Sequence, residues 1–211
     1  MNKNFDFDTD ARQEITGLIL AGGQASRMGG EDKGLILLEE KHLIAHVIDR
    51  FKPQVKQIVI SCNRNIDVYS RYEYPLASDQ ANNPGEKPQF NGPLAGILAG
   101  MASIDTPYTL IVPCDCPALS LNLGGKLLSS LISNNSDIAV PFDGERQQPL
   151  FLLIKTRLKD ELKDYYEHDG RSIRQWLKGK EVTEVCFIKE KASFINLNTP
   201  EELNSFTQSQ L

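Results

Sequence analysis

A glycine-rich segment near the N-terminus has the composition of a phosphate-binding loop. Residues 21–34 read Ala-Gly-Gly-Gln-Ala-Ser-Arg-Met-Gly-Gly-Glu-Asp-Lys-Gly, with five glycines in fourteen residues and two cations, Arg27 and Lys33. Because glycines lack a Cβ, several backbone N–H groups can approach one anion, and the cations add charge-assisted hydrogen bonds. The segment is not a Walker A sequence, since Asp32 rather than glycine precedes Lys33, and it contains no G-x-G-x-x-G motif. It predicts a polyphosphate ligand; the alternative is a tight strand-to-helix turn with incidental charges.

A second candidate is an aspartate that directly follows an apolar strand. Asp115 lies in the sequence Val-Pro-Cys-Asp-Cys-Pro at residues 112–117. Ligands bind beyond the carboxyl ends of parallel strands, so we expect Asp115 at the same rim as the glycine-rich segment. A carboxylate beside a polyphosphate indicates Mg²⁺, which takes one or two protein carboxylates and completes its shell with water and phosphate oxygens. A turn-forming role is the alternative. Cys114 and Cys116 have a poor metal spacing, and we expect them to pack rather than react.

Apolar segments that alternate with helical ones must position these residues. The runs at 15–20, 57–61 and 108–112 are apolar and β-rich, which is typical of parallel strands covered on both faces. Amphipathic residues 42–51 and the Pro-initiated segment 93–101 predict helices, and 137–142 with 148–154 predict two strands joined by a loop. Residues 82–93, rich in Asn, Gly and Pro, predict a long loop. The predicted fold class is α/β, with helices on both sides of a mostly parallel central sheet.

The composition excludes several classes of protein. The chain has 211 residues, 40% hydrophobic and 24% charged, which indicates one globular domain. A net charge of −5 supplies no basic field, so we expect neither nucleic acid nor a membrane as partner. No apolar run approaches the ~18 residues of a transmembrane helix, the first ten residues do not resemble a signal peptide, and four cysteines are too few for a disulfide framework. We therefore expect a cytoplasmic protein, with residues 1–14 as a flexible tail and 15–211 as a single domain.

Five motifs in order give the chain a resemblance to a known family. They are Leu-Ala-Gly-Gly-x-x-x-Arg-Met-Gly-Gly-x-Asp-Lys-Gly at 20–34, Asn63, Gly-Pro-Leu-Ala-Gly at 92–96, Pro-Cys-Asp-x-Pro at 113–117 and Asn-x-Asn-Thr-Pro-Glu-Glu at 196–202. The sequence resembles the molybdenum cofactor guanylyltransferases of the nucleotidyltransferase superfamily. The resemblance implies a single Rossmann-like, three-layer domain of the nucleotidyltransferase type. It also implies transfer of GMP from Mg·GTP to the terminal phosphate of molybdopterin bound to molybdenum, with release of pyrophosphate.

The resemblance implies roles for individual residues. The implied nucleotide contacts are Leu20, Ala21, Gly22, Gly23, Lys33, Asn63, Asp79 and Asp115. The implied catalytic residues are Arg27 and Lys33, on the phosphates, and Asp115, as the Mg²⁺ ligand. The implied acceptor contacts are Gln148, Arg171, Arg174, Asn196 and Asn198. Residues 15–116 would thus bind the nucleotide and residues 140–205 the acceptor. The chain departs from the usual family pattern in its longer loop at 82–90 and in Gln148, which stands where histidine is common.

Other interpretations of these residues stay open. The chain could be a cytidylyl- or uridylyltransferase acting on a small phosphorylated sugar or alcohol, or a non-catalytic GTP-binding module. Asn63 could cap a turn, and Arg171 and Arg174 could share the solvated face of a short amphipathic helix. The three histidines are scattered and predict no metal cluster. As protein partners, the resemblance suggests molybdenum-insertion proteins and apo-molybdoenzymes.

Overall fold

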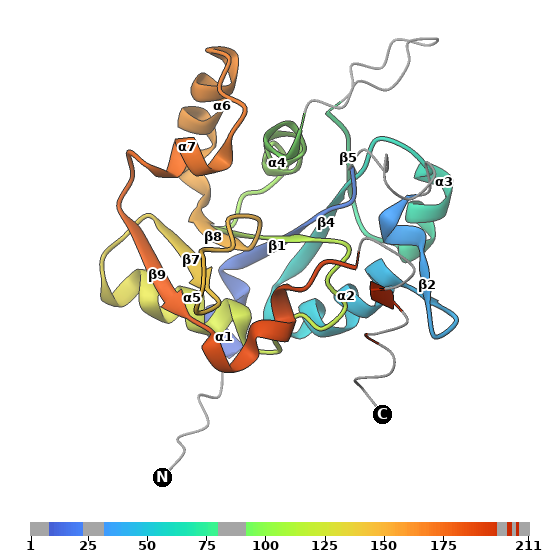
Figure 1. Cartoon of the computed structure of the whole chain (residues 1–211). Coiled ribbons are helices and arrows are strands. Elements are labelled where there is room, and N and C mark those ends of the chain that lie inside the picture. Colours follow the sequence, from blue (N-terminus) through green and yellow to red (C-terminus); the bar gives the residue numbers. More distant parts are fainter. Residues whose placement is uncertain (1–8, 23–31, 80–91, 198–201, 204–205, 207–211) are drawn as a thin grey trace.

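The computed structural model describes residues 9–22, 32–79, 92–197, 202–203 and 206, which contain a seven-stranded sheet. In spatial order its strands are β5 (Leu76–Ala77), β4 (Gln57–Ser61), β1 (Ile15–Leu20), β6 (Tyr108–Pro113), β8 (Leu152–Lys155), β7 (Ile138–Phe142) and β9 (Val182–Cys186). Neighbouring strands pair in parallel except at β8, which is antiparallel to β6 and β7. The predicted mostly parallel sheet of an α/β domain is confirmed (Figure 1).

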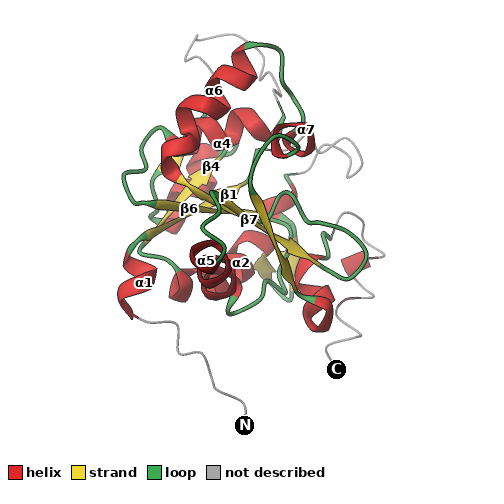
Figure 2. Cartoon of the chain, turned by 90° about the vertical axis from the view of Figure 1, so that its left-hand side faces the viewer, coloured by secondary structure: helices red, strands yellow, loops and turns green. Residues whose placement is uncertain are grey.

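Helices cover both faces of this sheet (Figures 1 and 2). One face carries α4 (Pro93–Met101), α6 (Lys159–Glu167) and α7 (Ile173–Leu177), and the other carries α1 (Thr9–Gln13), α2 (Leu43–Phe51) and α5 (Leu123–Ser133). Alternate residues of a strand point to opposite faces. In β1, Ile15 and Ile19 pack in the core cluster with α2 and α5, whereas Leu18 packs in the cluster with α4, α6 and α7. The uniformly apolar strands are therefore buried on both sides, as a three-layer domain requires.

The central strand β1 approaches its covering helix closely. A Cβ on Gly17 would lie 2.4 Å from the Phe51 ring, whose side chain is fully buried at the end of α2. Only glycine at this position leaves space for that ring, so Gly17 sets how tightly α2 packs on the sheet.

The remaining elements are short connections. They are α3 (Ile66–Tyr69), the antiparallel pair β2 (Leu37–Leu38) and β3 (Lys41–His42), and the 3-10 helices η1 (Lys33–Leu35), η2 (Lys52–Gln54), η3 (Ser70–Tyr72), η4 (Thr156–Leu158) and η5 (Ile188–Phe194). Of the helices within the described residues, none has the length and apolarity to cross a membrane.

Two segments differ from the sequence prediction, and a third lies mostly outside the described residues. The tail predicted for residues 1–14 is wrong for Thr9–Gln13, which form α1, because Ala11 packs against the core. β8 begins at Leu152 rather than at residue 148, because the Phe151 N–H donates to the Gln148 carbonyl at 2.9 Å and closes a turn. The predicted loop at 82–93 lies mostly outside the described residues.

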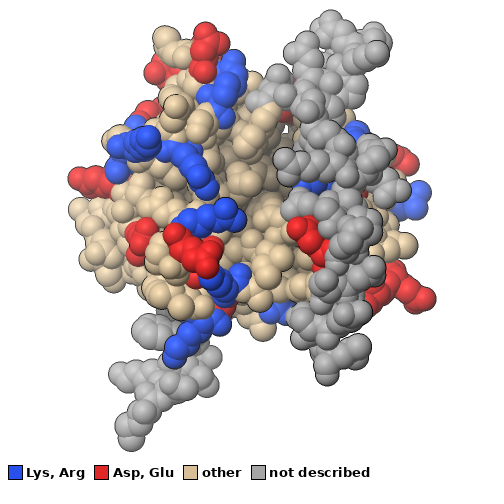
Figure 3. Space-filling model, viewed as in Figure 1, with Lys and Arg blue, Asp and Glu red and all other residues tan. Residues whose placement is uncertain are grey.

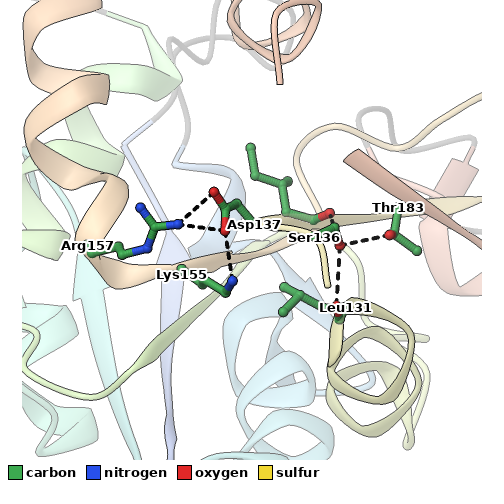
Figure 4. A network of polar contacts seen from close by, with 7 residues as sticks. Leu131, Ser136, Asp137, Lys155, Arg157 and Thr183 are labelled. Carbon is green, nitrogen blue, oxygen red and sulfur yellow. Dashed lines mark hydrogen bonds and ion pairs between the residues drawn. The ribbon is translucent and has the colours of Figure 1, made fainter. Parts of the chain in front are cut away.

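A polar network ties the reversed strand β8 to its neighbours (Figure 4). Asp137, just before β7, accepts hydrogen bonds from Lys155 Nζ at 2.8 Å and from Arg157 Nη2 at 2.7 Å. Beside it, the Ser136 hydroxyl accepts from Thr183 Oγ1 of β9 at 2.7 Å and donates to the Leu131 carbonyl of α5 at 3.5 Å. The hydrogen bond from Lys155, with that from Arg157, lowers the pKa of Asp137 below its usual value. The start of β7 is thus fastened to α5, β8 and β9.

Candidate active site

Charge is mixed over the face shown in Figure 3. On this face, Lys and Arg side chains lie beside Asp and Glu side chains, and the described residues in view carry both signs of charge. A phosphate site on this chain must therefore be local, as the net charge of −5 also indicates.

A cavity of about 350 Å³ lies at the carboxyl ends of β1, β4 and β6. Separate parts of the chain contribute its walls. They are Leu20, Ala21, Gly22, Asp32, Lys33, Ser61, Asn63, Asp79, Gly92, Pro93, Gly96, Pro113, Cys114, Asp115, Leu150 and Asn196. The described residues that were predicted to bind nucleotide or to be catalytic all line this one cavity: Leu20, Ala21, Gly22, Lys33, Asn63, Asp79 and Asp115.

Backbone pairing brings the strand ends together. Leu20 pairs with Ser61 of β4 and with Pro113 of β6. Beyond the paired residues, the Ala21 N–H donates to the Ser61 carbonyl at 2.8 Å, and the Cys114 N–H donates to the Leu20 carbonyl at 3.1 Å. The segments that follow β1 and β6 therefore leave the sheet side by side. The prediction that Asp115 shares a rim with the start of the glycine-rich segment is confirmed.

Asp115 is 5% exposed and has polar partners from two parts of the chain. Lys33 Nζ lies 3.6 Å from its Oδ2, and the Asn196 side-chain amide donates to its Oδ1 at 3.0 Å. The Leu197 N–H donates to the Asp115 carbonyl at 3.0 Å. Burial raises the pKa of Asp115 above its ordinary value, while Lys33 and Asn196 favour the charged form and oppose this shift. Asn196, predicted as an acceptor contact, is thus bonded to the predicted metal ligand.

The donor set at this cavity fits Mg²⁺ better than a transition metal. Within the described ranges, no three side chains of the His, Cys, Asp and Glu types gather as a ligand group. Zinc would need about four such ligands. Mg²⁺ needs only one or two carboxylates when phosphate and water oxygens fill its other positions, and Asp115 can supply one.

Asn63 and Asp79 form the wall beside β4. Asn63 Oδ1 accepts from the Ser78 hydroxyl at 3.0 Å and from the Asp79 N–H at 3.2 Å, so its side chain fastens the segment after β5. Burial raises the pKa of Asp79. Asp79 Oδ1 is buried and has no hydrogen-bond partner among the residues that the structure describes. A ligand carrying N–H or O–H donors would satisfy this oxygen.

Three of the predicted acceptor residues, Gln148, Arg171 and Arg174, are not among the described residues that line the cavity. Gln148 is buried and donates its side-chain amide to Asp143 Oδ2 at 2.5 Å. Arg174 is exposed on α7. Gly23, Arg27 and Asn198 lie outside the described residues.

Arg171 occupies a different position from the one predicted. It precedes α7, whose N-cap is Ser172, so it does not share a helix face with Arg174, and the alternative that placed both on one face is wrong. The Arg171 guanidinium donates to the carbonyls of Tyr166 at 2.6 Å and Gly170 at 2.9 Å. These bonds end the turn between α6 and α7.

Several cavity residues had no role assigned from the sequence. Asp32, Ser61 and Leu150 line the cavity, as do Gly92, Pro93 and Gly96 at the start of α4. Ser61 ends β4, so the strand-end rule that selected Asp115 could have selected it as well. Leu150 carries no signal, because an apolar residue in a turn is not distinctive.

The two cysteines beside Asp115 are packing residues, as predicted. Cys114 and Cys116 are buried and form no disulfide. Burial raises the pKa of both thiols well above the ordinary value, and Asp115 adds to the shift. Burial therefore disfavours the thiolate form that a nucleophilic cysteine needs.

Comparison with known proteins gives a consistent result. A family model described as a MobA-like NTP transferase domain matches residues 17–185. A protein of Shewanella sediminis named molybdenum cofactor guanylyltransferase is 40% identical over 93% of this chain and 97% of its own length. A protein of the same name from Shewanella baltica is 41% identical over 90% of this chain and 93% of its own length.

Solved structures share the fold. Molybdopterin-guanine dinucleotide biosynthesis protein A from Archaeoglobus fulgidus superposes with a TM-score of 0.74 at 24% identity, over 93% of this chain and 100% of that one. A 4-diphosphocytidyl-2C-methyl-D-erythritol synthase from Anaerococcus prevotii superposes with a TM-score of 0.69 at 14% identity, over 94% and 97%. The architecture is therefore common to enzymes with different names, and the fold alone does not select a substrate.

Proposed function

The chain belongs to the MobA-like NTP transferase family, and from this premise we propose that it transfers GMP from GTP to the terminal phosphate of molybdopterin bound to molybdenum. Pyrophosphate leaves, and the guanine dinucleotide form of the cofactor is the product. GTP and the molybdenum-bearing molybdopterin are then its substrates, and we expect the reaction to take place in the cytoplasm.

One observation carries the proposal. Nucleotide-binding residues predicted from separated motifs, at 20–22, 33, 63, 79 and 115, line a single cavity at the carboxyl ends of three parallel strands. Chance turns and caps would not collect these residues at one place. Sequence identity to the named guanylyltransferases over nearly the whole chain supports GTP and molybdopterin as the substrates.

The chemistry places modest demands on the protein. The attacking group is a phosphate oxygen that is already ionised at neutral pH, so no general base is needed. Lys33 would stabilise negative charge on the departing pyrophosphate, with Arg27 as a second cation proposed from the sequence. Asp115, with its Oδ1 fixed by Asn196, would present Oδ2 to the metal. When bound, Mg²⁺ would supply positive charge to the reacting phosphates.

Orientation of the two anionic substrates is the other contribution. In the best intramolecular models, correct placement of two reacting groups is worth up to ~7–11 kcal/mol of the barrier. Asn196 lies in the cavity beside Asp115, so the acceptor phosphate would approach from the segment that follows β9. Gln148, Arg171, Arg174 and Asn198 are proposed to hold the rest of the acceptor. We also propose molybdenum-insertion proteins and apo-molybdoenzymes as partners that deliver the substrate and take the product.

A turnover assay tests the proposal against its alternatives. Pyrophosphate release is measured with GTP, CTP, UTP and ATP, each with and without Mg²⁺ and with and without molybdenum-bound molybdopterin. We expect release only with GTP, Mg²⁺ and the acceptor together. Release with CTP or UTP and a sugar or alcohol phosphate would support the second candidate instead. Tight GTP binding without any release would indicate a non-catalytic nucleotide-binding module.

A further inference from the structure

Asp32, next to Lys33 in the sequence, is a buried carboxylate with partners on both oxygens. It is 7% exposed. Its Oδ1 accepts from the Tyr69 hydroxyl at 2.7 Å and from the Gly34 N–H at 3.3 Å. Its Oδ2 accepts from the Asn65 side-chain amide at 3.0 Å and lies 3.4 Å from Arg64 Nε. Four groups therefore surround one buried carboxylate. The Arg64 guanidinium balances its charge, and the hydrogen-bond donors satisfy its two oxygens.

The side-chain partners of Asp32 come from the segment that directly follows Asn63, a residue of another wall of the cavity. Arg64, Asn65 and Tyr69 all belong to the segment that follows β4 and contains α3. The residue after Asp32 is Lys33, and the residue before Arg64 is Asn63; both line the cavity. Asp32 therefore links the segment carrying Lys33 to the segment carrying Asn63. The ion pair and hydrogen bonds fix the separation of the two walls where the nucleotide is proposed to bind.

Gly34 completes this arrangement. A Cβ on Gly34 would lie 2.5 Å from Tyr69 Oη and 3.1 Å from Cys114 Sγ. The absence of a side chain lets the Tyr69 hydroxyl reach Asp32 and lets η1 pack against the segment after β6. In the Asp-Lys-Gly sequence, Asp32 bonds to the segment after β4, Lys33 lines the cavity, and Gly34 leaves space for the Tyr69 side chain that bonds Asp32.

We propose that Asp32 is a positioning residue that holds Lys33 in the cavity, and not a second carboxylate ligand of the metal. This rests on the proposed function, in which Lys33 contacts the nucleotide phosphates. The four partners occupy both oxygens of Asp32, whereas Oδ2 of Asp115 has the Lys33 ammonium at 3.6 Å as its side-chain partner within the described residues. Asp32 acts through Lys33, and its loss matters only while Lys33 is present.

A double-mutant cycle tests this dependence. Asp32→Asn, Lys33→Ala and the double variant are compared with the wild type by kcat and KM for GTP in pyrophosphate release. Asp32→Asn alone is expected to lower kcat/KM about tenfold, and to lower it by less than about twofold when Lys33 is already alanine. The Mg²⁺ concentration that gives half-maximal rate is expected to stay unchanged. The proposal would be overturned if the two single losses in kcat/KM multiplied in the double variant. It would also be overturned if Asp32→Asn needed more Mg²⁺ to reach half-maximal rate.

A second variant guards against misfolding of Asp32→Asn. Tyr69→Phe removes one hydrogen bond from Asp32 while keeping the buried ring, and Tyr72→Phe is its matched control, because that hydroxyl bonds His42 instead. Only Tyr69→Phe is expected to lower kcat/KM, and only while Lys33 is present. Equal effects of the two tyrosine variants would overturn the proposal.

The wild type separates this proposal from the proposed function. If it releases no pyrophosphate from GTP, guanylyl transfer fails. The same four proteins are then compared by calorimetry, as binding free energies for whichever Mg·nucleoside triphosphate the wild type binds. Coupling between the effects of the substitutions at 32 and 33 supports the positioning role, and additive effects overturn it.

Discussion

Asp115 must be charged to hold a cation, yet its burial opposes that charge. Its pKa is raised by removal from water, and the Lys33 ammonium together with the Asn196 amide limits the shift. The proposed metal site is therefore not a property of one residue. It depends on a cation from the segment after β1 and an amide from the segment after β9.

Asp115→Asn is expected to remove most activity while the protein stays folded. The asparagine oxygen is a weaker Mg²⁺ ligand, so we expect kcat at saturating Mg²⁺ to fall by roughly 10² or more. It can still accept from Asn196, and the main-chain bond to Leu197 is unchanged, so thermal unfolding should be close to that of the wild type. Asp67→Asn, at an exposed position of α3, is the control. Unchanged turnover would make Asp115 a turn former.

Lys33→Ala is expected to lower turnover by roughly 10²–10³, as for loss of one preorganised charge-stabilising group. The side chain is 27% exposed, so its removal leaves a small gap at the cavity wall rather than a hole in the core. Pyrophosphate release and circular dichroism are measured in parallel, with the exposed Lys56→Ala as control. Turnover near the wild-type value would contradict the role of Lys33 on the phosphates.

At the scale of elements, the close approach of β1 and α2 makes the core sensitive to a single methyl group. Gly17→Ala would place its Cβ 2.4 Å from the Phe51 ring, and both groups are enclosed. We expect the free energy of unfolding in urea to fall by about 1–3 kcal/mol. Gly179→Ala, where a Cβ would meet nothing within 4 Å, serves as control. Equal stability of the two variants would show that α2 moves away at little cost.

The network at the start of β7 is expected to show in the pH dependence of stability. The pKa of Asp137 is lowered in the folded protein, so its charged form stabilises the fold above the unfolded pKa of about 3.9, and this contribution disappears as pH falls through the lowered folded pKa. Asp137→Asn should therefore be less stable than the wild type by a constant amount between about pH 7 and about pH 5, with a difference that narrows below about pH 4. Urea unfolding at several pH values measures it. If the stability difference between the two proteins did not narrow at lower pH, ionisation of Asp137 would be excluded as its cause.

Element positions were predictable where burial alone determines them. The apolar runs at 15–20 and 57–61 coincide with β1 and β4, because a strand covered on both faces is apolar along most of its length. The start of β8 was not predictable, because Leu150 and Phe151 continue its apolar run into a turn that is closed by one backbone hydrogen bond. Helix α1 was missed because one alanine packed on the core leaves little pattern in five residues.

At the scale of the molecule, the sequence predicted the rim of the site and several residues that line it, but not the contacts between those residues. Parallel strands must deliver their carboxyl ends to one edge, which was enough to bring Asp115 near the glycine-rich segment. The order of the strands, and hence the contact of Asn196 with Asp115 across 81 positions, depends on long-range packing that no local pattern encodes. The partners of Asp32 were hidden for the same reason.

The division of the chain between its two substrates gives a prediction for the whole molecule. Arg174→Ala combined with Asn198→Ala is expected to raise the KM for the acceptor while the affinity for GTP stays nearly constant. Two polar contacts at ~1–3 kcal/mol each would make the change at least about tenfold. GTP and the acceptor are titrated separately, thermal unfolding is checked, and the exposed Arg71→Ala is the control. A defect confined to GTP, or none in either titration, refutes the division.

The single reversed strand has a consequence for how such a protein can change. Because β8 alone runs backwards, β7 and β9 point the same way as β1 and β6, and the segments that follow them emerge at the rim of the cavity. The exposed residues 144–147 can therefore vary without disturbing a strand that carries the cavity, whereas Asn196 must be kept because it bonds Asp115. A new acceptor could be acquired through changes at such exposed positions, while the parallel strands that carry the proposed nucleotide site stay as they are.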